Sequence, residues 1–148
     1  MATVNCYIAA SPSQVFAALC DGWYYSGWVV GTSHVRAVDA DWPAVGSRIH
    51  HAAGVWPLVT RDETLVEEVD LDHRLVLTAR GRPLGEARVV ITLAGESPGT
   101  RLTMEETPTA GPGQWLHNPA TEALLIRRNT ESLARLTALA ERRTQPVK

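Results

Sequence analysis

The feature that most constrains the fold is a succession of strand-like segments that is followed by one long amphipathic helix. Between residues 33 and 106, apolar residues alternate with polar ones, and Gly, Pro and Asp separate the runs. A sheet that is one layer thick must bury its apolar face against another element, and the last helix is the only segment long enough. The sequence therefore predicts an antiparallel sheet wrapped around the C-terminal helix. The expected strands after residue 33 are 34–38, 47–53, 59–69, 75–80, 87–93 and 101–105.

The expected long helix covers residues 119–142, which at 1.5 Å per residue would span roughly 36 Å. Asn118 and Pro119 form a capping signal before it, and residues 107–119 hold three prolines, which predicts a long loop. Charged residues, among them Arg127, Arg128 and Glu131, should cover the polar side of the helix. The expected apolar stripe consists of Leu125, Ile126, Leu133, Leu136, Leu139 and Ala140.

The N-terminal part predicts one more strand and two short helices. Val4, Cys6 and Ile8 alternate with polar neighbours, as in a half-buried strand. Ser11 and Pro12 then form a helix start, and that helix should run to about Cys20. Residues 23–28 hold four aromatic side chains and predict a second short helix that is broken at Gly27 and Gly31.

Length and composition predict one domain over residues 1–148, with a polar tail at 143–148. A net charge of −2 and 45% hydrophobic residues exclude a disordered chain and a strongly basic nucleic-acid-binding protein. We expect no membrane insertion, because no apolar run approaches 18 residues, and no signal peptide, so the expected location is the cytoplasm. Cys6 and Cys20 are too few for a disulfide framework or a zinc site, which predicts two buried or half-buried thiols.

The strand–helix–helix–strands–helix order resembles the helix-grip fold of the SRPBCC superfamily. Its members include START lipid-transfer domains, birch-pollen-allergen-like proteins and bacterial polyketide cyclase/dehydrase proteins. Residues 10–16 (ASPSQVF) look like the family's passage from first strand to first helix, and residues 39–51 and 80–89 look like its actinobacterial members. The resemblance implies an α+β protein with a deep, mostly apolar cavity between the concave sheet and the long helix.

The adjacent histidines His50 and His51 are the first candidates for chemistry, because imidazole titrates near neutral pH. Neighbours on a strand point to opposite faces, so if Ile49 is inside, His51 is inside and His50 faces solvent. His51 is then either a catalytic acid or base, a ligand contact, or a hydrogen-bonded structural histidine. The sequence has no metal-binding motif and predicts neither a metal nor a cofactor.

Asn129 places an amide on the expected apolar stripe, four residues after Leu125 and four before Leu133. A buried amide must be hydrogen-bonded, so it either bonds a polar group of the sheet, such as His51 or a glutamate, or orients a ligand. The carboxylate pairs Glu67–Glu68 and Glu105–Glu106 are each split between the two faces of a strand, so at most one of each enters the cavity. The alternative is that these glutamates only keep the outer face soluble.

Two further residue types are candidates for the cavity. Arg80 and Arg82 could hold an anionic ligand group, although scattered surface arginines are the commoner arrangement. In the fold that the sequence resembles, Trp28, Trp56 and Trp115 lie in segments at the cavity mouth, where indole rings could stack on a planar ligand. Trp42 is instead expected to lie in a turn and to pack on the outside of the fold.

The sequence is compatible with three functions. The first is a binding module for a small hydrophobic or aromatic molecule, lipid- or polyketide-like, as a monomer or a homodimer. The second is a polyketide cyclase, aromatase or dehydratase in which His51 or an inward glutamate moves a proton. The third is a non-catalytic module that binds a protein partner. The expected ligand-binding residues are Trp28, His51, Trp56, Met104, Trp115, Leu125 and Asn129.

Overall fold

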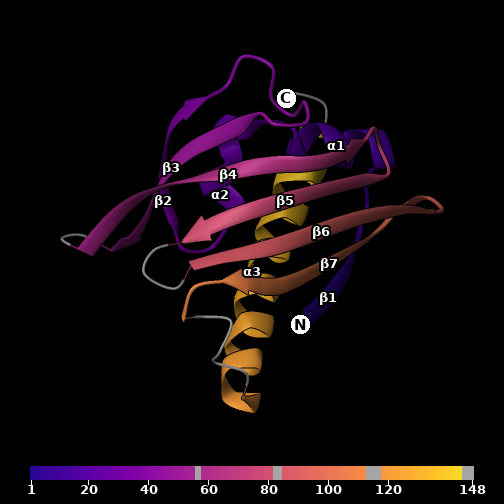
Figure 1. Ribbon diagram of the computed structural model, residues 1–148. Helices are drawn as coiled ribbons and strands as arrows, with labels where there is room; N and C mark the ends of the chain where they lie inside the picture. Colours follow the sequence, from indigo (N-terminus) through magenta and orange to yellow (C-terminus); the bar gives the residue numbers. More distant parts are fainter. Residues whose placement is uncertain (56–57, 82–84, 113–117, 145–148) are drawn as a thin grey trace.

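The computed structural model describes residues 1–55, 58–81, 85–112 and 118–144 and contains one antiparallel sheet of seven strands (Figure 1). The strand order is β1-β7-β6-β5-β4-β3-β2, so strands two to seven form a meander and β1 adds to its end. The strands are β1 (Ala2–Ile8), β2 (Thr32–Val38), β3 (Arg48–Val55), β4 (Leu58–Asp70), β5 (Arg74–Gly81), β6 (Gly85–Glu96) and β7 (Gly99–Ala110). This arrangement confirms the predicted α+β helix-grip fold.

The helices occupy the concave side of the sheet (Figure 1). Helix α1 (Pro12–Leu19) begins with a capping box in which the Ser11 hydroxyl accepts from the Gln14 N–H. The short helices η1 (Gly22–Tyr24) and α2 (Tyr25–Trp28) follow, and α2 continues through Gly27, where a break was predicted. Helix α3 (Pro119–Thr144) crosses the concave face and contacts β1, α1 and α2.

The core lies between the inner face of the sheet and the C-terminal half of α3. On β6, Ile91 and Leu93 are buried, and Thr92 and Ala94 are exposed, which confirms the predicted alternation. Ile91 lies opposite Met104 of β7 and Leu75 of β5, so the apolar rows continue across strands. Helix α3 covers these rows with Leu133, Leu136 and Ala140, each 2% exposed or less.

Strand β7 is longer than predicted, because residues 107–110 were expected to belong to a loop. Pro108 lies within this extension, opposite Ala87 of β6. The pairing of β7 with β1 ends at Glu106, so beyond that residue β7 has a neighbouring strand on one edge alone. Proline lacks a donor and is tolerated where a strand has a free edge. The proline content therefore did not prevent strand formation there.

Helix α3 differs from the prediction at one position of the stripe and at its end. Ile126 is 39% exposed, so it is not part of the buried stripe, since the buried side of the helix follows Asn129, Leu133 and Leu136. The helix continues to Thr144, two residues beyond the predicted end, and Arg143 pairs with Asp21 at 2.6 Å. The remainder of the predicted tail lies outside the described residues.

Trp42 is less exposed than predicted. It does lie in a turn, but its ring packs against the core beside Gly22 and Val38. A Cβ atom at Gly22 would lie 2.8 Å from Val38 Cγ1 and 3.3 Å from Trp42 Cδ1, so the missing side chain makes room for this packing. Cys6 and Cys20 are free and half-buried, and burial raises the pKa of Cys20 to about 11. Among the described helices, none has an apolar stretch long enough to span a bilayer.

Candidate functional site

A cavity of about 240 Å³ lies between the concave face of the sheet, helix α2 and the N-terminal half of α3. Its lining comes from strands β2 to β7 on one side and from both helices on the other. This is the place that the helix-grip resemblance implied. The apolar side chains of the lining include Trp28, Val29, Leu77, Val89, Met104 and Leu125.

One polar group of the cavity consists of Tyr25, His51 and Thr64. The Thr64 hydroxyl lies 2.9 Å from His51 Nε2 and 3.1 Å from the Tyr25 hydroxyl. The Tyr25 and His51 rings are stacked with an interplanar angle of 19°, and Tyr25 also meets Trp28 edge to face. All three residues of the group are buried, so they form a fixed chain of hydrogen bonds from β3 through β4 to α2.

Burial controls the protonation of this group. It lowers the pKa of His51 below its ordinary value, against the opposing field of Asp62, so the imidazole is neutral at neutral pH. Burial also raises the pKa of Tyr25, which keeps the phenol protonated. His51 Nδ1 and Trp28 Nε1 are buried and have no hydrogen-bond partner among the described residues. The group is therefore an uncharged set of donors and acceptors.

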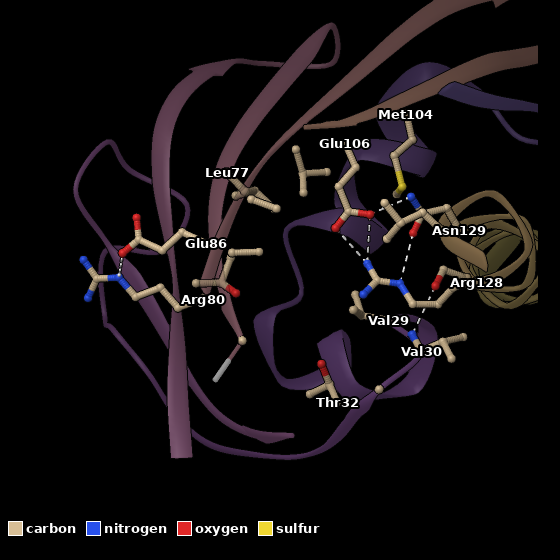
Figure 2. Close-up of a pocket in the computed structure, with 18 of the residues that line it drawn as sticks. Val29, Val30, Thr32, Leu77, Arg80, Glu86, Met104, Glu106, Arg128 and Asn129 are labelled. Atoms are coloured by element: carbon tan, nitrogen blue, oxygen red, sulfur yellow. Dashed lines mark hydrogen bonds and ion pairs between the residues drawn. The ribbon is translucent and has the colours of Figure 1, made fainter. Parts of the chain in front are cut away.

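The second polar group consists of Glu106, Arg128 and Asn129 and lies where β7 meets α3 (Figure 2). Arg128 Nη2 lies 2.9 Å and 3.1 Å from the two carboxylate oxygens of Glu106. Asn129 Nδ2 donates to Glu106 Oε2 at 2.8 Å, and Asn129 Oδ1 accepts from Arg128 Nε at 3.2 Å. Each member thus bonds the other two, which satisfies a carboxylate that is only 4% exposed.

Strand and helix periods explain why these side chains converge. Leu102, Met104 and Glu106 are all buried on β7, because every second residue points toward α3. Asn129 is 1% exposed on the helix face that also holds Leu133 and Leu136. A carboxylate and an amide therefore follow apolar residues along two buried rows and meet at the cavity wall.

The predicted ligand-binding residues fall into two sets. Trp28, His51, Met104, Leu125 and Asn129 all line the cavity. Trp56 and Trp115 lie outside the described residues, as does Arg82. His50 points to the other face of β3, where its Nε2 lies 3.0 Å from Asp39 Oδ1.

Among the polar lining residues, sequence reasoning missed Tyr25 and Thr64 and misplaced Arg128. Tyr25 and Thr64 were not proposed, and Glu106 was considered only as one of two possible inward glutamates. Arg128 was assigned to the polar side of α3, but its side chain reaches across the cavity wall to Glu106 (Figure 2). Alternate residues of a strand share a face, so the apolar residues Leu102 and Met104 indicate that Glu106, and not Glu105, lies on the inner face of β7. Nothing in the helix pattern indicates that a 40% exposed Arg128 side chain bends inward.

The remaining charged candidates form ion pairs on the sheet. Arg80 lies at the rim of the cavity, where its Nε is 2.8 Å from Glu86 and its Nη1 contacts Glu63. Glu67 accepts from Thr78 and from Arg88, away from the cavity lining. Within the part of the chain that the structure describes, no three His, Cys, Asp or Glu residues gather in a way that could hold a metal ion.

A family model described as "Polyketide cyclase / dehydrase and lipid transport" matches residues 2–141. The chain belongs to this family. The match covers every strand and nearly all of α3. No curated protein matches the chain significantly.

Solved structures share the fold of this polyketide cyclase/dehydrase family member at low sequence identity. Protein CV1439 from Chromobacterium violaceum has a TM-score of 0.69 at 20% identity, with 94% of this chain and 96% of that chain covered. Protein SA2116 from Staphylococcus aureus, of unknown function, has a TM-score of 0.74 at 11% identity, with 97% and 94% covered. The di-domain ARO/CYC protein StfQ of steffimycin biosynthesis has a TM-score of 0.71 at 12% identity, with 95% and 50% covered. These likenesses establish the fold alone.

Proposed function

We propose that this protein binds a small, mostly apolar molecule in the cavity between the sheet and α3. The observation that carries the proposal is a 240 Å³ space with an apolar lining and two compact polar groups. Sites for small molecules commonly combine apolar walls with a few polar groups that fix orientation. A hydrocarbon or aromatic body would contact Trp28, Leu77 and Val89, and a polar substituent would meet one of the two groups.

The family match supports the same function at a coarser level, because its description combines polyketide cyclisation and lipid transport. Two structures that share the fold are DynU16 from the dynemicin biosynthetic locus and the di-domain ARO/CYC protein StfQ from the steffimycin biosynthetic pathway. A lipid-like or polyketide-like ligand is therefore the proposed class. Trp56 and Trp115 are also proposed to contact the ligand, because in the family fold their segments lie at the cavity mouth. A protein-partner module is not favoured, because the space between sheet and helix, about 240 Å³, is large enough for a small molecule.

Native mass spectrometry of freshly purified protein tests this proposal, followed by a thermal-shift panel of lipids, polyketides and aromatic acids. Ala87→Leu adds a side chain to the cavity lining, whereas Ala94→Leu makes the same change on the exposed face of the same strand. We expect a retained or stabilising small molecule with wild type and Ala94→Leu, and loss of it with Ala87→Leu. Absence of any bound molecule and of any thermal shift would overturn the proposal.

A second candidate is proton-transfer catalysis of the cyclase or dehydratase type, and the His51–Thr64–Tyr25 chain favours it. A neutral imidazole hydrogen-bonded through a hydroxyl to a cavity tyrosine can accept or return a proton. The test is turnover of a bound β-polyketone by wild type and His51→Gln. Catalysis predicts that product formation falls at least 100-fold while ligand affinity stays within twofold. Equal turnover by both proteins, or none by wild type, rejects it.

A further inference from the structure

The charged residues of the cavity occur as matched pairs. Among the lining residues that the structure describes, Arg80 and Arg128 carry positive charge, and Glu86 and Glu106 carry negative charge. Arg80 pairs with Glu86 at the rim, and Arg128 pairs with Glu106 in the wall (Figure 2). The positive and negative charges are therefore equal in number, and each lies within 3 Å of its opposite.

The inner pair determines what a ligand meets. Glu106 is 4% exposed and accepts three hydrogen bonds, two from Arg128 and one from Asn129. A carboxylate ligand at Arg128 would have to share the guanidinium with this buried carboxylate, and the two like charges would repel each other. An uncharged oxygen has no such conflict.

Arg128 keeps a donor for such an oxygen. Its Nε and Nη2 groups bond Asn129 and Glu106, whereas Nη1 makes no hydrogen bond to the described residues. The other polar group adds no charge, because the buried His51 is neutral and Tyr25 keeps its proton. The cavity therefore offers the Arg128 Nη1 donor and the uncharged groups of Tyr25, His51 and Thr64, in a setting without net charge.

We infer that Glu106 sets the charge specificity of the cavity, so that the protein binds uncharged, carbonyl- or hydroxyl-bearing apolar molecules and rejects the corresponding carboxylates. The ligand oxygen accepts from Arg128, and Glu106 cancels the positive charge that would otherwise attract an anion. This inference rests on the proposed binding function and names the substrate class of the same site.

Two matched probes test it by isothermal titration calorimetry at pH 7.5: 2-acetylnaphthalene, a ketone, and 2-naphthoate, its carboxylate counterpart. We expect wild type to bind the ketone at least tenfold more tightly. Glu106→Gln leaves the positive charge of Arg128 without a compensating carboxylate and should raise the naphthoate affinity at least tenfold. The ketone affinity should stay within threefold of the wild-type value. Glu105→Gln removes the same charge from the opposite face of β7 and should change neither affinity more than twofold.

The double variant Glu106→Gln/Arg128→Gln identifies the source of the gained affinity. It removes both charges, so naphthoate binding should return to the wild-type level. Equal binding of both probes by wild type, or no gain of naphthoate affinity in Glu106→Gln, overturns this inference and leaves the binding function standing. If wild type and Glu105→Gln bind neither probe, the binding function fails for this ligand class, and the inference fails with it.

Discussion

The rings of Tyr25 and His51 stack with centroids 5.5 Å apart, and their polar ends meet at one hydroxyl group, that of Thr64. Two residues from different elements thus depend on a single buried oxygen that is held by β4. Removing this oxygen leaves two buried polar atoms without a partner, whereas the stacked rings retain their apolar contact.

Thr64→Val tests that dependence, because valine has nearly the same shape and lacks the hydroxyl. We expect the free energy of unfolding to fall by about 2–6 kcal/mol, as each of the two unsatisfied buried groups costs about 1–3 kcal/mol. Urea denaturation monitored by tryptophan fluorescence measures the change. Thr92→Val, at an exposed position of β6, is the control and should stay within about 0.5 kcal/mol of wild type. A Thr64→Val protein as stable as this control would show that the oxygen is dispensable.

Asn129→Asp introduces a second carboxylate 2.8 Å from the position of a Glu106 oxygen, without changing the size of the side chain. We expect a loss of about 2–4 kcal/mol at pH 7, because a buried charge would face a like charge. The loss should shrink as the pH falls, since protonation of one carboxyl removes the repulsion. Denaturation at pH 7 and pH 5 measures both effects.

The matched control for that change is Asn5→Asp, on the exposed side of β1 near Arg101. It makes the same isosteric substitution, and its stability should remain close to that of wild type at both pH values. Comparable losses in the two variants would contradict the buried arrangement of Asn129 and Glu106.

His51 should make stability depend on pH in the mildly acidic range. Its pKa is lower in the folded protein than its ordinary value of 6.5, so the unfolded chain takes up a proton first as the pH falls. The stabilising contribution of neutral His51 is complete above pH 6.5 and is lost as the pH falls toward the lowered folded pKa. Thermal unfolding from pH 7.5 to 5 should therefore show a shallower decline in Tm for His51→Gln than for wild type.

His34→Gln is the control for this measurement, since His34 lies on β2 and is exposed to solvent. Its Tm should follow the wild-type pH profile. If His51→Gln also follows that profile in parallel, burial of the neutral imidazole does not contribute to acid sensitivity.

The packing of α3 on the sheet predicts a large difference between two leucines of the same helix. Leu136 is fully buried, whereas Leu124 is 68% exposed near the helix start. Leu136→Ala should lower the free energy of unfolding by about 2–5 kcal/mol, because it removes buried methyl groups and leaves a cavity. Leu124→Ala should change it by less than about 0.5 kcal/mol. Chemical denaturation of the two variants side by side measures this difference.

The sequence predicted elements well where apolar periods were long. The alternation of side chains between Ala87 and Leu93 correctly predicted the inner face of β6. The same two-residue period correctly predicted that His51 lies on the same face of its strand as Ile49. The sequence did not predict the positions of the charged ends of long side chains. The periodicity of a helix or strand indicates the direction of each Cα–Cβ bond, but not how far a long side chain reaches from it. Arg128 is at the margin of the buried helix face, yet its guanidinium reaches Glu106.

Tyr25 illustrates a different limit. Four aromatic residues lie within 23–28, and propensity gives no reason to bury Tyr25 and Trp28 while Trp23 is 60% and Tyr24 51% exposed. The selection follows from the pairing of Tyr25 with Thr64 across 39 positions of sequence. Such a contact depends on how the helices sit on the finished sheet, which local patterns do not specify.

The placement of β1 beside β7 has a consequence for biosynthesis. Ala2 pairs with Glu106, so β1 is synthesised roughly a hundred residues before its partner strand. At about 5–20 residues per second this delay is of the order of 5–20 s, and α3, which covers the apolar face, emerges later still. The nascent chain therefore carries an uncovered sheet surface until α3 has left the ribosome. The sheet is covered only after α3 has been made, so this interval is the one in which holding chaperones can act on its apolar face.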